Sequence, residues 1–411
     1  MAGLFDTLSQ RGFVKQCSNE PELRRLLESD TVYMYAGFDP TYSSLHVGHL
    51  VPVMAMIHAA KAGHKPILLI GGGTARIGDP SGKTEMRKML SVEDIDTNAA
   101  SIKGQLEAFL GYFGVTGLYP DNKSWLAELN YIDFLRDIGR HFSVNRMLSF
   151  ETYKMRMETG LSFIEFNYQL LQSFDFLELN RRYGCRLQIG GDDQWGNIVA
   201  GVDLIRRVES IEAIGLTFPL VTRADGKKMG KTEAGALYLD AALRTPHEFF
   251  QYFRNVPDDD VEKLFLIFTL LPVEEISELV AYRDERINAA KERLAYEITA
   301  AVHGPAEAEA ARTAATSAFA ASAGSGDLSA VPSVAIPRTR LEAGISAVDL
   351  FAETDLCASK GEARRLVQQG GARIHDTKIE DIDTVVDASW LADGELILRA
   401  GKKRLFRVVA S

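Results

Sequence analysis

Two short stretches carry side chains whose types and spacing suit phosphate chemistry. The first, "LHVGHL" at 45–50, places His46 and His49 three residues apart around Gly48. Imidazoles and free backbone N–H groups at a helix N-terminus can face an anion, and glycine lets a ligand approach the backbone. A metal would need a third ligand, and none has the right spacing. Alone, the pattern also allows an ordinary surface pair.

The second stretch is "DGKKMGKT" at 225–232, which crowds cations onto a glycine-containing loop after an Asp–Gly turn. Most lysine runs are solvated surface. The functional interpretation is a mobile loop in which Lys228, Lys231 and Thr232 close on a polyphosphate. The two stretches occur in this order about 180 residues apart, and each strengthens the phosphate interpretation of the other.

A third set lies on one predicted helix, "SFIEFNYQLLQSFDF" at 162–176, which opens with a capping-box pattern. Tyr168, Gln172 and Asp175 fall at i, i+4 and i+7, on one face. An amphipathic helix with its polar face in water is the alternative. The narrow polar stripe favours a pocket for a ligand with an amine and a hydroxyl, because unpaired buried polar groups cost about 1–3 kcal/mol.

A fourth set is "LQIGGDDQWGN" at 187–197, where a strand ends in two glycines and Asp192, Asp193 and Gln194 begin a helix. Carboxylates there can accept hydrogen bonds from sugar hydroxyls or an ammonium group. Helix capping by Asp192 or Asp193 is the alternative.

The elements that position these residues alternate up to about residue 220. We predict strands at 31–38, 65–73 and 185–191 and a helix at 50–63, which is typical of an α/β domain with a mostly parallel sheet. Such sheets bind ligands at the carboxyl ends of their strands. Residues 246–320 have helical periodicity, 322–344 are rich in Gly, Ser and Pro, and 345–411 form a small α+β unit with a final hairpin.

Composition narrows the class of protein. The chain has 411 residues, 46% apolar and 25% charged, and a net charge of −10, which is ordinary for a multidomain soluble protein. No apolar run has membrane-spanning length, so we expect a cytoplasmic protein with no membrane partner. Cys17, Cys185 and Cys357 are widely spaced, and we expect reduced core thiols. "GGGTAR" and "GDPSGKT" each miss the spacing of a nucleotide-binding glycine motif.

Together these residues resemble a known family. "HVGH" and "KMGKT" resemble the HIGH and KMSKS signatures of class I aminoacyl-tRNA synthetases. "YAGFDPTYSSLHVGHL", "IGDPSGKTEMR", "FNYQLLQSFDF", "IGGDDQWGN" and the last 67 residues resemble the bacterial-type tyrosyl-tRNA synthetases, over essentially the whole chain. Ala36 and Asp192 depart from it, since many members have Cys and Ser there.

The resemblance implies an α/β fold and a set of domains. We expect a Rossmann-like parallel-sheet catalytic domain at 1–220, the KMSKS-like loop and a helical subdomain at 221–320, and a linker at 321–344. The small α+β C-terminal RNA-binding domain at 345–411 resembles that of a small-subunit ribosomal protein.

It also implies tyrosine activation by ATP, followed by transfer to tRNA(Tyr), and a role for each matching residue. The groups expected to bind tyrosine are Tyr35, Asp79, Tyr168, Gln172, Asp175, Gln188 and Gln194. The groups expected to bind ATP are Asp39, His46, His49, Gly191, Asp193 and Lys231. The groups expected to act on the triphosphate are Thr41, His46, His49, Lys228, Lys231 and Thr232. Mg²⁺ would arrive with ATP, and no protein-bound structural metal is expected.

The same resemblance implies a homodimer, with the apolar-rich stretch around 125–165 as a possible interface, and cationic contacts to RNA. The expected tRNA-binding residues are Arg206, Arg207, Lys360, Arg364, Arg365, Lys402 and Lys403. A solvated surface is the alternative for all of them. Three other functions remain as alternatives: a tryptophanyl-tRNA synthetase, a small-molecule nucleotidyltransferase with an H-x-G-H site, and a catalytically silent RNA-binding protein.

Overall fold

The computed structural model describes residues 3–410, except 82–89, 223–228, 230, 233–234, 283, 285, 323–331, 355, 376, 393 and 402–403. The chain divides into two compact units, Met1–Ala308 and Glu309–Ser411. Lys228, Lys402 and Lys403 lie outside the described residues, and the backbone alone is described for Lys231 and Thr232.

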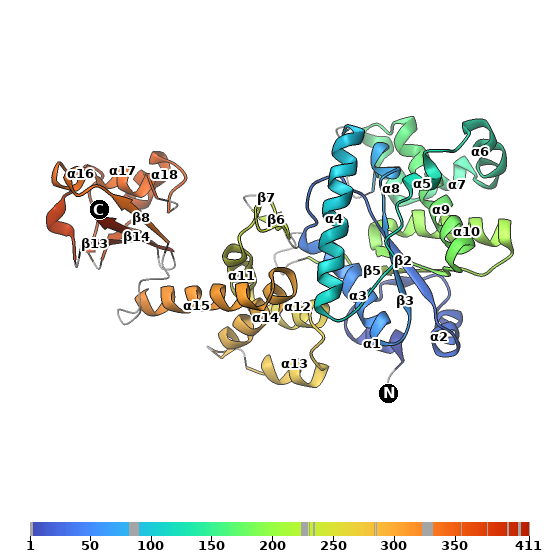
Figure 1. Cartoon of the computed structure of the whole chain (residues 1–411), viewed down its shortest axis with the longest axis horizontal. Helices are drawn as coiled ribbons and strands as arrows, with labels where there is room; N and C mark the ends of the chain where they lie inside the picture. Colours follow the sequence, from blue (N-terminus) through green and yellow to red (C-terminus); the bar gives the residue numbers. More distant parts are fainter. Residues whose placement is uncertain are drawn as a thin grey trace. The chain divides into compact units, whose positions relative to one another are not determined.

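The first unit is built on a five-stranded sheet in the order β1-β5-β4-β2-β3 (Figure 1). Strands β5, β4, β2 and β3 run parallel, and β1 pairs antiparallel with β5 at one edge. The strands are β1 (Gln16–Cys17), β2 (Tyr33–Phe38), β3 (Lys65–Ile70), β4 (Leu187–Gly191) and β5 (Ile214–Phe218). This confirms the predicted α/β class and the three predicted strands.

Continuous burial explains why these strands read as apolar runs. Every residue of β5 is buried, as is every residue of β3 after its first, because helices cover a parallel sheet on both faces. Tyr35, Ile67 and Leu69 share one hydrophobic cluster with side chains of α9 (Phe163–Tyr183) and α10 (Trp195–Glu209). Helix α9 is therefore packed directly against the sheet strand that carries Tyr35.

Other helices complete the unit. Those of the α/β part are α1 (Leu4–Gln10), α2 (Glu20–Ser29), α3 (Leu50–Lys61), α4 (Val92–Tyr112), α5 (Lys123–Leu126), α6 (Tyr131–Asp137), α7 (Val144–Ser149) and α8 (Glu151–Thr159). The predicted helical region contains α11 (Pro246–Arg254), α12 (Val261–Phe268), α13 (Val273–Leu279), α14 (Ile287–His303) and the start of α15 (Pro305–Ser322). A short hairpin, β6 (Lys231–Thr232) and β7 (Gly235–Ala236), precedes them.

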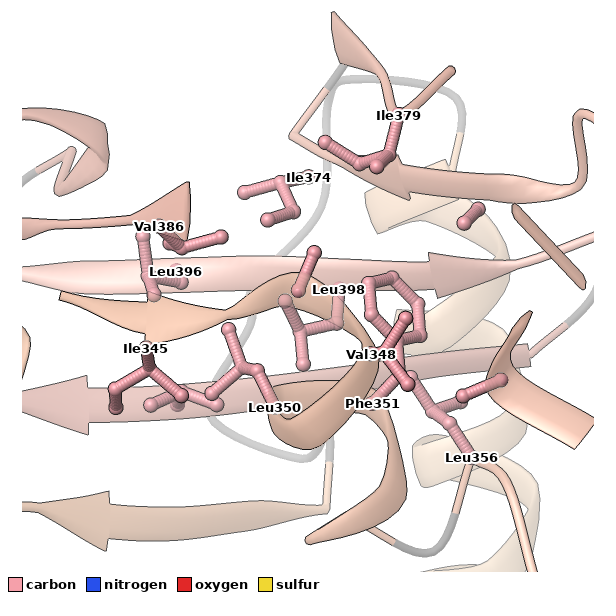
Figure 2. Close-up of a cluster of buried hydrophobic side chains, with 14 of the residues drawn as sticks. Ile345, Val348, Leu350, Phe351, Leu356, Ile374, Ile379, Val386, Leu396 and Leu398 are labelled. Atoms are coloured by element: carbon pink, nitrogen blue, oxygen red, sulfur yellow. The ribbon is translucent and has the colours of Figure 1, made fainter. Parts of the chain in front are cut away.

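The C-terminal unit has its own sheet and core. Five strands lie in the order β11-β10-β13-β14-β8, and β12 pairs with β9 in a second small sheet. Figure 2 shows the apolar cluster beneath them, where Leu350 and Phe351 lie close to Leu398. The elements are β8 (Ser333–Ile336), α16 (Arg338–Glu342), β9 (Ile345–Ser346), α17 (Ala347–Ala352), α18 (Lys360–Gln368), β10 (Ala372–Ile374), β11 (Thr377–Lys378), β12 (Val385–Val386), β13 (Glu395–Ala400) and β14 (Arg404–Ala410). Strands β13 and β14 form the predicted hairpin.

The structure differs from the predicted linker at 321–344. Its second half contains β8, which runs parallel to β14, and α16. Ile336 and Leu341 are buried in the C-terminal core. A four-residue edge strand between two prolines is too short to show periodicity. It could therefore not be predicted as a strand without its partner β14.

Helices α17 and α18 are separate, because α17 ends at Ala352 and Ser359 caps α18. The chain between them turns Leu356 and Cys357 into the core. All three cysteines are unpaired, but Cys17 is partly exposed and is not a core thiol.

Candidate active site

The predicted tyrosine-binding residues lie within strands β2 and β4, after the ends of β3 and β4, and on helix α9. Tyr35 of β2 lies directly beside Gln188 of β4 in the strand register, and both are about 2% exposed or less. Asp39 follows the end of β2, and Gly191 ends β4. Helix α9 adds Tyr168, Gln172 and Asp175 from above the sheet. The structure thus joins residues from three separated stretches of sequence.

The deepest part of the site is a buried carboxylate with two donors. The Trp125 Nε1–H donates to Asp175 Oδ1 at 2.7 Å, and Asn122 Nδ2 donates to Oδ2 at 2.9 Å. Burial raises the pKa of Asp175 to about 8, against these two hydrogen bonds, which lower it. A site that holds an ionisable carboxyl this deeply is suited to accept a ligand hydroxyl.

Two polar atoms beside this carboxylate lack partners. The Tyr35 hydroxyl and Gln188 Oε1 are both buried without a hydrogen bond. Burial raises the pKa of Tyr35 well above its usual value, and the neighbouring charge of Asp175 adds to the effect. An unpaired buried polar group costs about 1–3 kcal/mol. A ligand that brings a hydroxyl into this pocket would remove part of that cost.

A hydrogen-bonded chain links this pocket to a second carboxylate. Asn122 Nδ2 also donates to Thr74 Oγ1 at 3.0 Å, and Thr74 donates to Asp39 Oδ1 at 2.7 Å. The Tyr168 hydroxyl donates to the other oxygen, Oδ2, at 2.9 Å. The resemblance implies that Tyr168 binds the tyrosine amino group and that Asp39 binds ATP, and the structure brings these two side chains into contact.

A second chain runs through α10. Gln194 Nε2 donates to Asp79 Oδ2 at 2.8 Å. Asn197 Nδ2 donates to Gln172 Oε1 at 3.0 Å and to Gln194 Oε1 at 3.2 Å. The partly exposed carboxylates of Asp79 and Asp39 therefore face the same region with fixed orientations. Carboxylates held in this way attract an ammonium group.

The glycine that ends β4 has a steric role. A Cβ on Gly191 would lie 2.6 Å from Asp193 Oδ1, so glycine alone lets that carboxylate approach the backbone. Asp192 and Asp193 belong to the 3-10 turn η4 (Asp192–Gln194), which begins without a side-chain cap. Asp192 instead accepts from Gln16 Nε2 at 2.6 Å and Thr217 Oγ1 at 3.2 Å. Neither Asp192 nor Asp193 is the N-cap of the turn or of α10, so the capping alternative is wrong.

The two histidines form a stacked pair in the turn η1 (Val47–His49). Their ring centroids are 3.8 Å apart, and each Nδ1 accepts a backbone N–H: His46 from Gly48 and His49 from His46. In a neutral ring this leaves the hydrogen on Nε2. A Cβ on Gly48 would lie 3.0 Å from His46 Cε1, so the glycine makes room for the folded-back ring. Both imidazoles are thereby oriented as Nε2–H donors.

The chain that follows the second signature stretch pairs with the first. The hairpin of Lys231 and Thr232 leads directly into residues 237–239, which pair with residues 45–47. The Val47 N–H donates to Leu237 O at 3.0 Å. Thr41 lies in the same loop as the histidines, two residues after Asp39. The segment after the hairpin therefore connects the second stretch to the histidine turn.

Four residues that position the predicted groups were missed: Thr74, Asn122, Trp125 and Asn197. Three of them come after strand ends, where polar side chains of an α/β sheet often contact ligands. Residues 118 and 121 add to β3 through isolated parallel bridges, so "PDNKSW" at 120–125 follows a strand-like segment. That polar run after an apolar stretch was the available signal.

The predicted RNA-binding residues occupy exposed positions in two units. Arg206 and Arg207 are exposed at the end of α10, where Arg206 pairs with Asp203 at 3.2 Å and Arg207 donates to His141 O. Lys360, Arg364 and Arg365 are exposed on α18. In the described part of the chain there is no group of three or more potential metal ligands and no helix suited to cross a membrane.

Comparison with known proteins identifies the family. The family described as tRNA synthetases class I (W and Y) matches residues 28–320, and the Tyrosine--tRNA ligase SYY-like C-terminal domain matches residues 327–408. The chain belongs to this family of synthetases. The second match begins inside the predicted linker, in agreement with the place of β8 in the C-terminal sheet.

Full-length relatives give the same answer. The chain is 56% identical over 405 residues to a tyrosine--tRNA ligase of Treponema denticola, covering 98% of each chain. It is 54% identical over 403 residues to that of Treponema pallidum, covering 98% of this chain and 97% of the other. A truncated mitochondrial tyrosyl-tRNA synthetase of Aspergillus nidulans superposes with a TM-score of 0.70 at 30% identity, covering 76% of this chain and 93% of that one.

The pKa of Asp175 leads to a pH-dependent prediction. An ionised carboxylate accepts a hydrogen bond from a phenol more strongly than the neutral carboxyl group does. With a pKa of about 8 for Asp175, the ionised fraction rises from pH 7 to pH 9, and the preference for tyrosine over phenylalanine should rise with it, by up to about tenfold. Equilibrium dialysis of labelled tyrosine and labelled phenylalanine without ATP measures the ratio of their affinities. Both amino groups titrate over the same pH range, so their effect on this ratio cancels.

Asp175→Asn is the control, because its side chain does not titrate. The ratio in that variant should be flat across the same range. A flat ratio in the unmodified protein, or the same slope in Asp175→Asn, would contradict the role given to this carboxyl group.

Proposed function

We propose that this site activates L-tyrosine with ATP, giving tyrosyl-adenylate and pyrophosphate, and then transfers tyrosine to the 3′ end of tRNA(Tyr). The observation that carries the proposal is the buried Tyr35 hydroxyl, which lacks a partner and lies within the influence of the buried Asp175 carboxyl group. A phenol hydroxyl has both a donor and an acceptor. It can donate to Asp175 and accept from Tyr35 at the same time.

The other end of the amino acid would lie toward the sheet edge. Its ammonium group would be held by Asp79, Tyr168 and Gln172, and its carboxylate would lie near Gln194. Gln188 would support the same pocket from β4. The hydrogen bonds already made by Asp79 and Gln172 fix their orientation, which lowers the entropy lost when the ligand is ordered.

Activation requires little chemistry from the protein. A tyrosine carboxylate oxygen, already ionised at neutral pH, attacks the α-phosphorus of ATP. The bond from that phosphorus to the bridging oxygen breaks, and pyrophosphate leaves with the electron pair. No general base is needed, so catalysis consists of alignment and stabilisation of phosphate charge. ATP would enter as its Mg²⁺ complex, which neutralises part of that charge.

The triphosphate would meet donors from both signature stretches. His46 and His49 are oriented as Nε2–H donors by their Nδ1 contacts. We assign the remaining triphosphate contacts to Thr41, Lys228, Lys231 and Thr232, and the ribose and adenosine contacts to Asp39, Gly191 and Asp193. Preoriented donors of this kind stabilise charge without reorganising during the reaction.

Transfer to tRNA would use the exposed cations in both units. We propose that Arg206 and Arg207 contact the acceptor stem, and that Lys360, Arg364, Arg365, Lys402 and Lys403 track phosphates. We propose that the catalytic region is 1–220, that the helical region is 221–320, and that β8 and α16 join residues 345–411 in the RNA-binding region. Because charged tRNA is consumed in translation, we place the reaction in the cytoplasm.

Amino-acid-dependent exchange of labelled pyrophosphate into ATP, without tRNA, tests the proposal. Exchange should occur with tyrosine and be far weaker with phenylalanine and tryptophan, because these leave the buried polar groups unpaired. Asp175→Ala should reduce the preference for tyrosine over phenylalanine by about tenfold or more. Asp94→Ala, an exposed acid on α4, should retain it.

The alternatives predict different outcomes in this assay. Exchange with tryptophan in place of tyrosine would identify a tryptophanyl enzyme. An absence of exchange with all three amino acids would contradict the proposed function and favour a silent RNA-binding protein.

We also propose that the protein is a homodimer. Helices α6 to α9 expose eight large apolar side chains, among them Ile132 and Phe163, which are 68% and 69% exposed. The other six are Tyr131, Leu135, Val144, Met155, Met157 and Ile164. Scattered apolar residues are normal on a surface, but a concentration of this size within 34 residues indicates an interface. These side chains fall within the stretch around 125–165 in which we expect the interface, and this supports the proposal.

The variant Phe163→Glu tests the dimer. A charge at the most exposed apolar position should raise the dissociation constant by at least about 100-fold, since a buried unpaired charge is costly. Light scattering at micromolar protein should give twice the chain mass for the unmodified protein and the single chain mass for the variant. Val385→Glu, at a 57% exposed valine of β12, should remain dimeric. A monomer mass for the unmodified protein would contradict the proposal.

A further inference from the structure

The chain that follows the β6–β7 hairpin lies along the histidine turn as a short added strand. Leu239 N–H donates to Leu45 O at 2.9 Å, and Val47 N–H donates to Leu237 O at 3.0 Å. The next residue continues the contact, since Asp240 N–H donates to Ser44 Oγ at 3.1 Å. Both leucines of the added strand are buried. The segment after the hairpin is therefore joined to the histidine turn by backbone pairing.

The register of this pairing places Tyr238 beside His46. These two residues form an antiparallel bridge, and the flanking hydrogen bonds run from their neighbours. This is the non-hydrogen-bonded kind of pair, in which the Cα atoms are about 4.5 Å apart and both side chains project from the same face. Tyr238 and His46 are thus direct cross-strand neighbours.

A second tyrosine extends the arrangement. The rings of Tyr42 and Tyr238 are stacked, with centroids 4.7 Å apart and planes 19° from parallel. His46 in turn stacks on His49. The stacked tyrosines and the stacked histidines are therefore adjacent, because Tyr238 is the cross-strand neighbour of His46.

Packing into a core does not account for Tyr42. Its side chain is 48% exposed, so most of the ring surface not covered by Tyr238 faces solvent. An aromatic ring at such an exposed position stabilises the structure mainly through its stacking contact with the other ring. That contact joins the residue just after Thr41 to the residue two positions after β7.

We propose that Tyr42 and Tyr238 are a positioning pair that fixes the histidine turn and the base of the Lys231 hairpin relative to each other. The inference rests on the proposed function, in which donors from both segments act on the triphosphate. Neither tyrosine needs to touch the substrate. Their rings hold two donor sets in one geometry, so their loss should affect phosphate chemistry and leave the tyrosine pocket unchanged.

Single-turnover formation of the adenylate, measured with saturating tyrosine and varied ATP, tests the pair. Tyr42→Ala and Tyr238→Ala should each lower the rate constant of adenylate formation by about tenfold and raise the ATP concentration for half-maximal rate, because small displacements of aligned groups are costly. Equilibrium binding of tyrosine should change by less than about twofold, because the pocket residues lie elsewhere.

Conservative and double variants separate the stack from other effects. Tyr42→Phe and Tyr238→Phe keep the ring and should retain the rate to within about twofold. The double variant with both alanines should be no slower than the slower single variant, since one contact cannot be lost twice. Tyr112→Ala, at an exposed tyrosine that ends α4, is the matched control and should behave as the unmodified protein.

Three results would overturn the inference while leaving the proposed function intact. They are unchanged adenylate formation in the alanine variants, an equally large loss in the phenylalanine variants, and fully additive losses in the double variant. A loss of tyrosine binding as large as the loss of rate would also overturn it. If the unmodified protein forms no adenylate, the proposed function itself fails, and the two failures are thereby distinguished.

Discussion

The buried carboxyl group of Asp175 sets the main constraint on this molecule. It is 2% exposed, and a buried polar group needs partners. Trp125 and Asn122 supply two, and both follow the segment that pairs alongside β3 through Leu118 and Asp121. Asn122 is fixed in turn, because its backbone N–H donates to Ile70 O and its Oδ1 accepts from Gly73 N–H. The end of the sheet and helix α9 are thereby joined through one carboxyl group.

From that point a continuous network reaches the opposite end of the site. Asn122, Thr74, Asp39 and Tyr168 are linked in sequence by hydrogen bonds of 2.7–3.0 Å. The network orients the groups that would bind the hydroxyl and the ammonium of the same amino acid. The network supplies no partner for the Tyr35 hydroxyl or for Gln188 Oε1. A bound tyrosine could supply these missing hydrogen bonds.

The position of helix α9 is fixed by contacts at its first turn. Its first turn has the predicted capping box between Ser162 and Glu165, and Glu165 also pairs with the buried Arg156 of α8 at 2.8 Å. Burial raises the pKa of Glu165, but the hydrogen bonds from Ser162 and Arg156 outweigh it and hold the pKa below its usual value. Breaking such a buried pair typically costs about 3–5 kcal/mol, so the start of α9 is firmly placed.

The sequence predicted what depends on local pattern. The buried strands, the capping box of α9 and the face shared by Tyr168, Gln172 and Asp175 follow from periodicity and spacing, and the family follows from ordered motifs. Trp125 and Asn122 were missed because their role depends on a contact with α9 more than 45 residues away. Strand β8 was missed for the same reason, since four residues become a strand only beside β14.

The most direct test of this account is equilibrium binding of tyrosine and phenylalanine to the variant Tyr35→Phe. Removing the unpartnered hydroxyl deletes one hydrogen bond to a phenol and nothing else. We expect the preference for tyrosine to fall by about five- to tenfold while phenylalanine binds at least as well as before. An unchanged preference, or an equal loss of affinity for both amino acids, would contradict the claim that this pocket recognises a phenol hydroxyl.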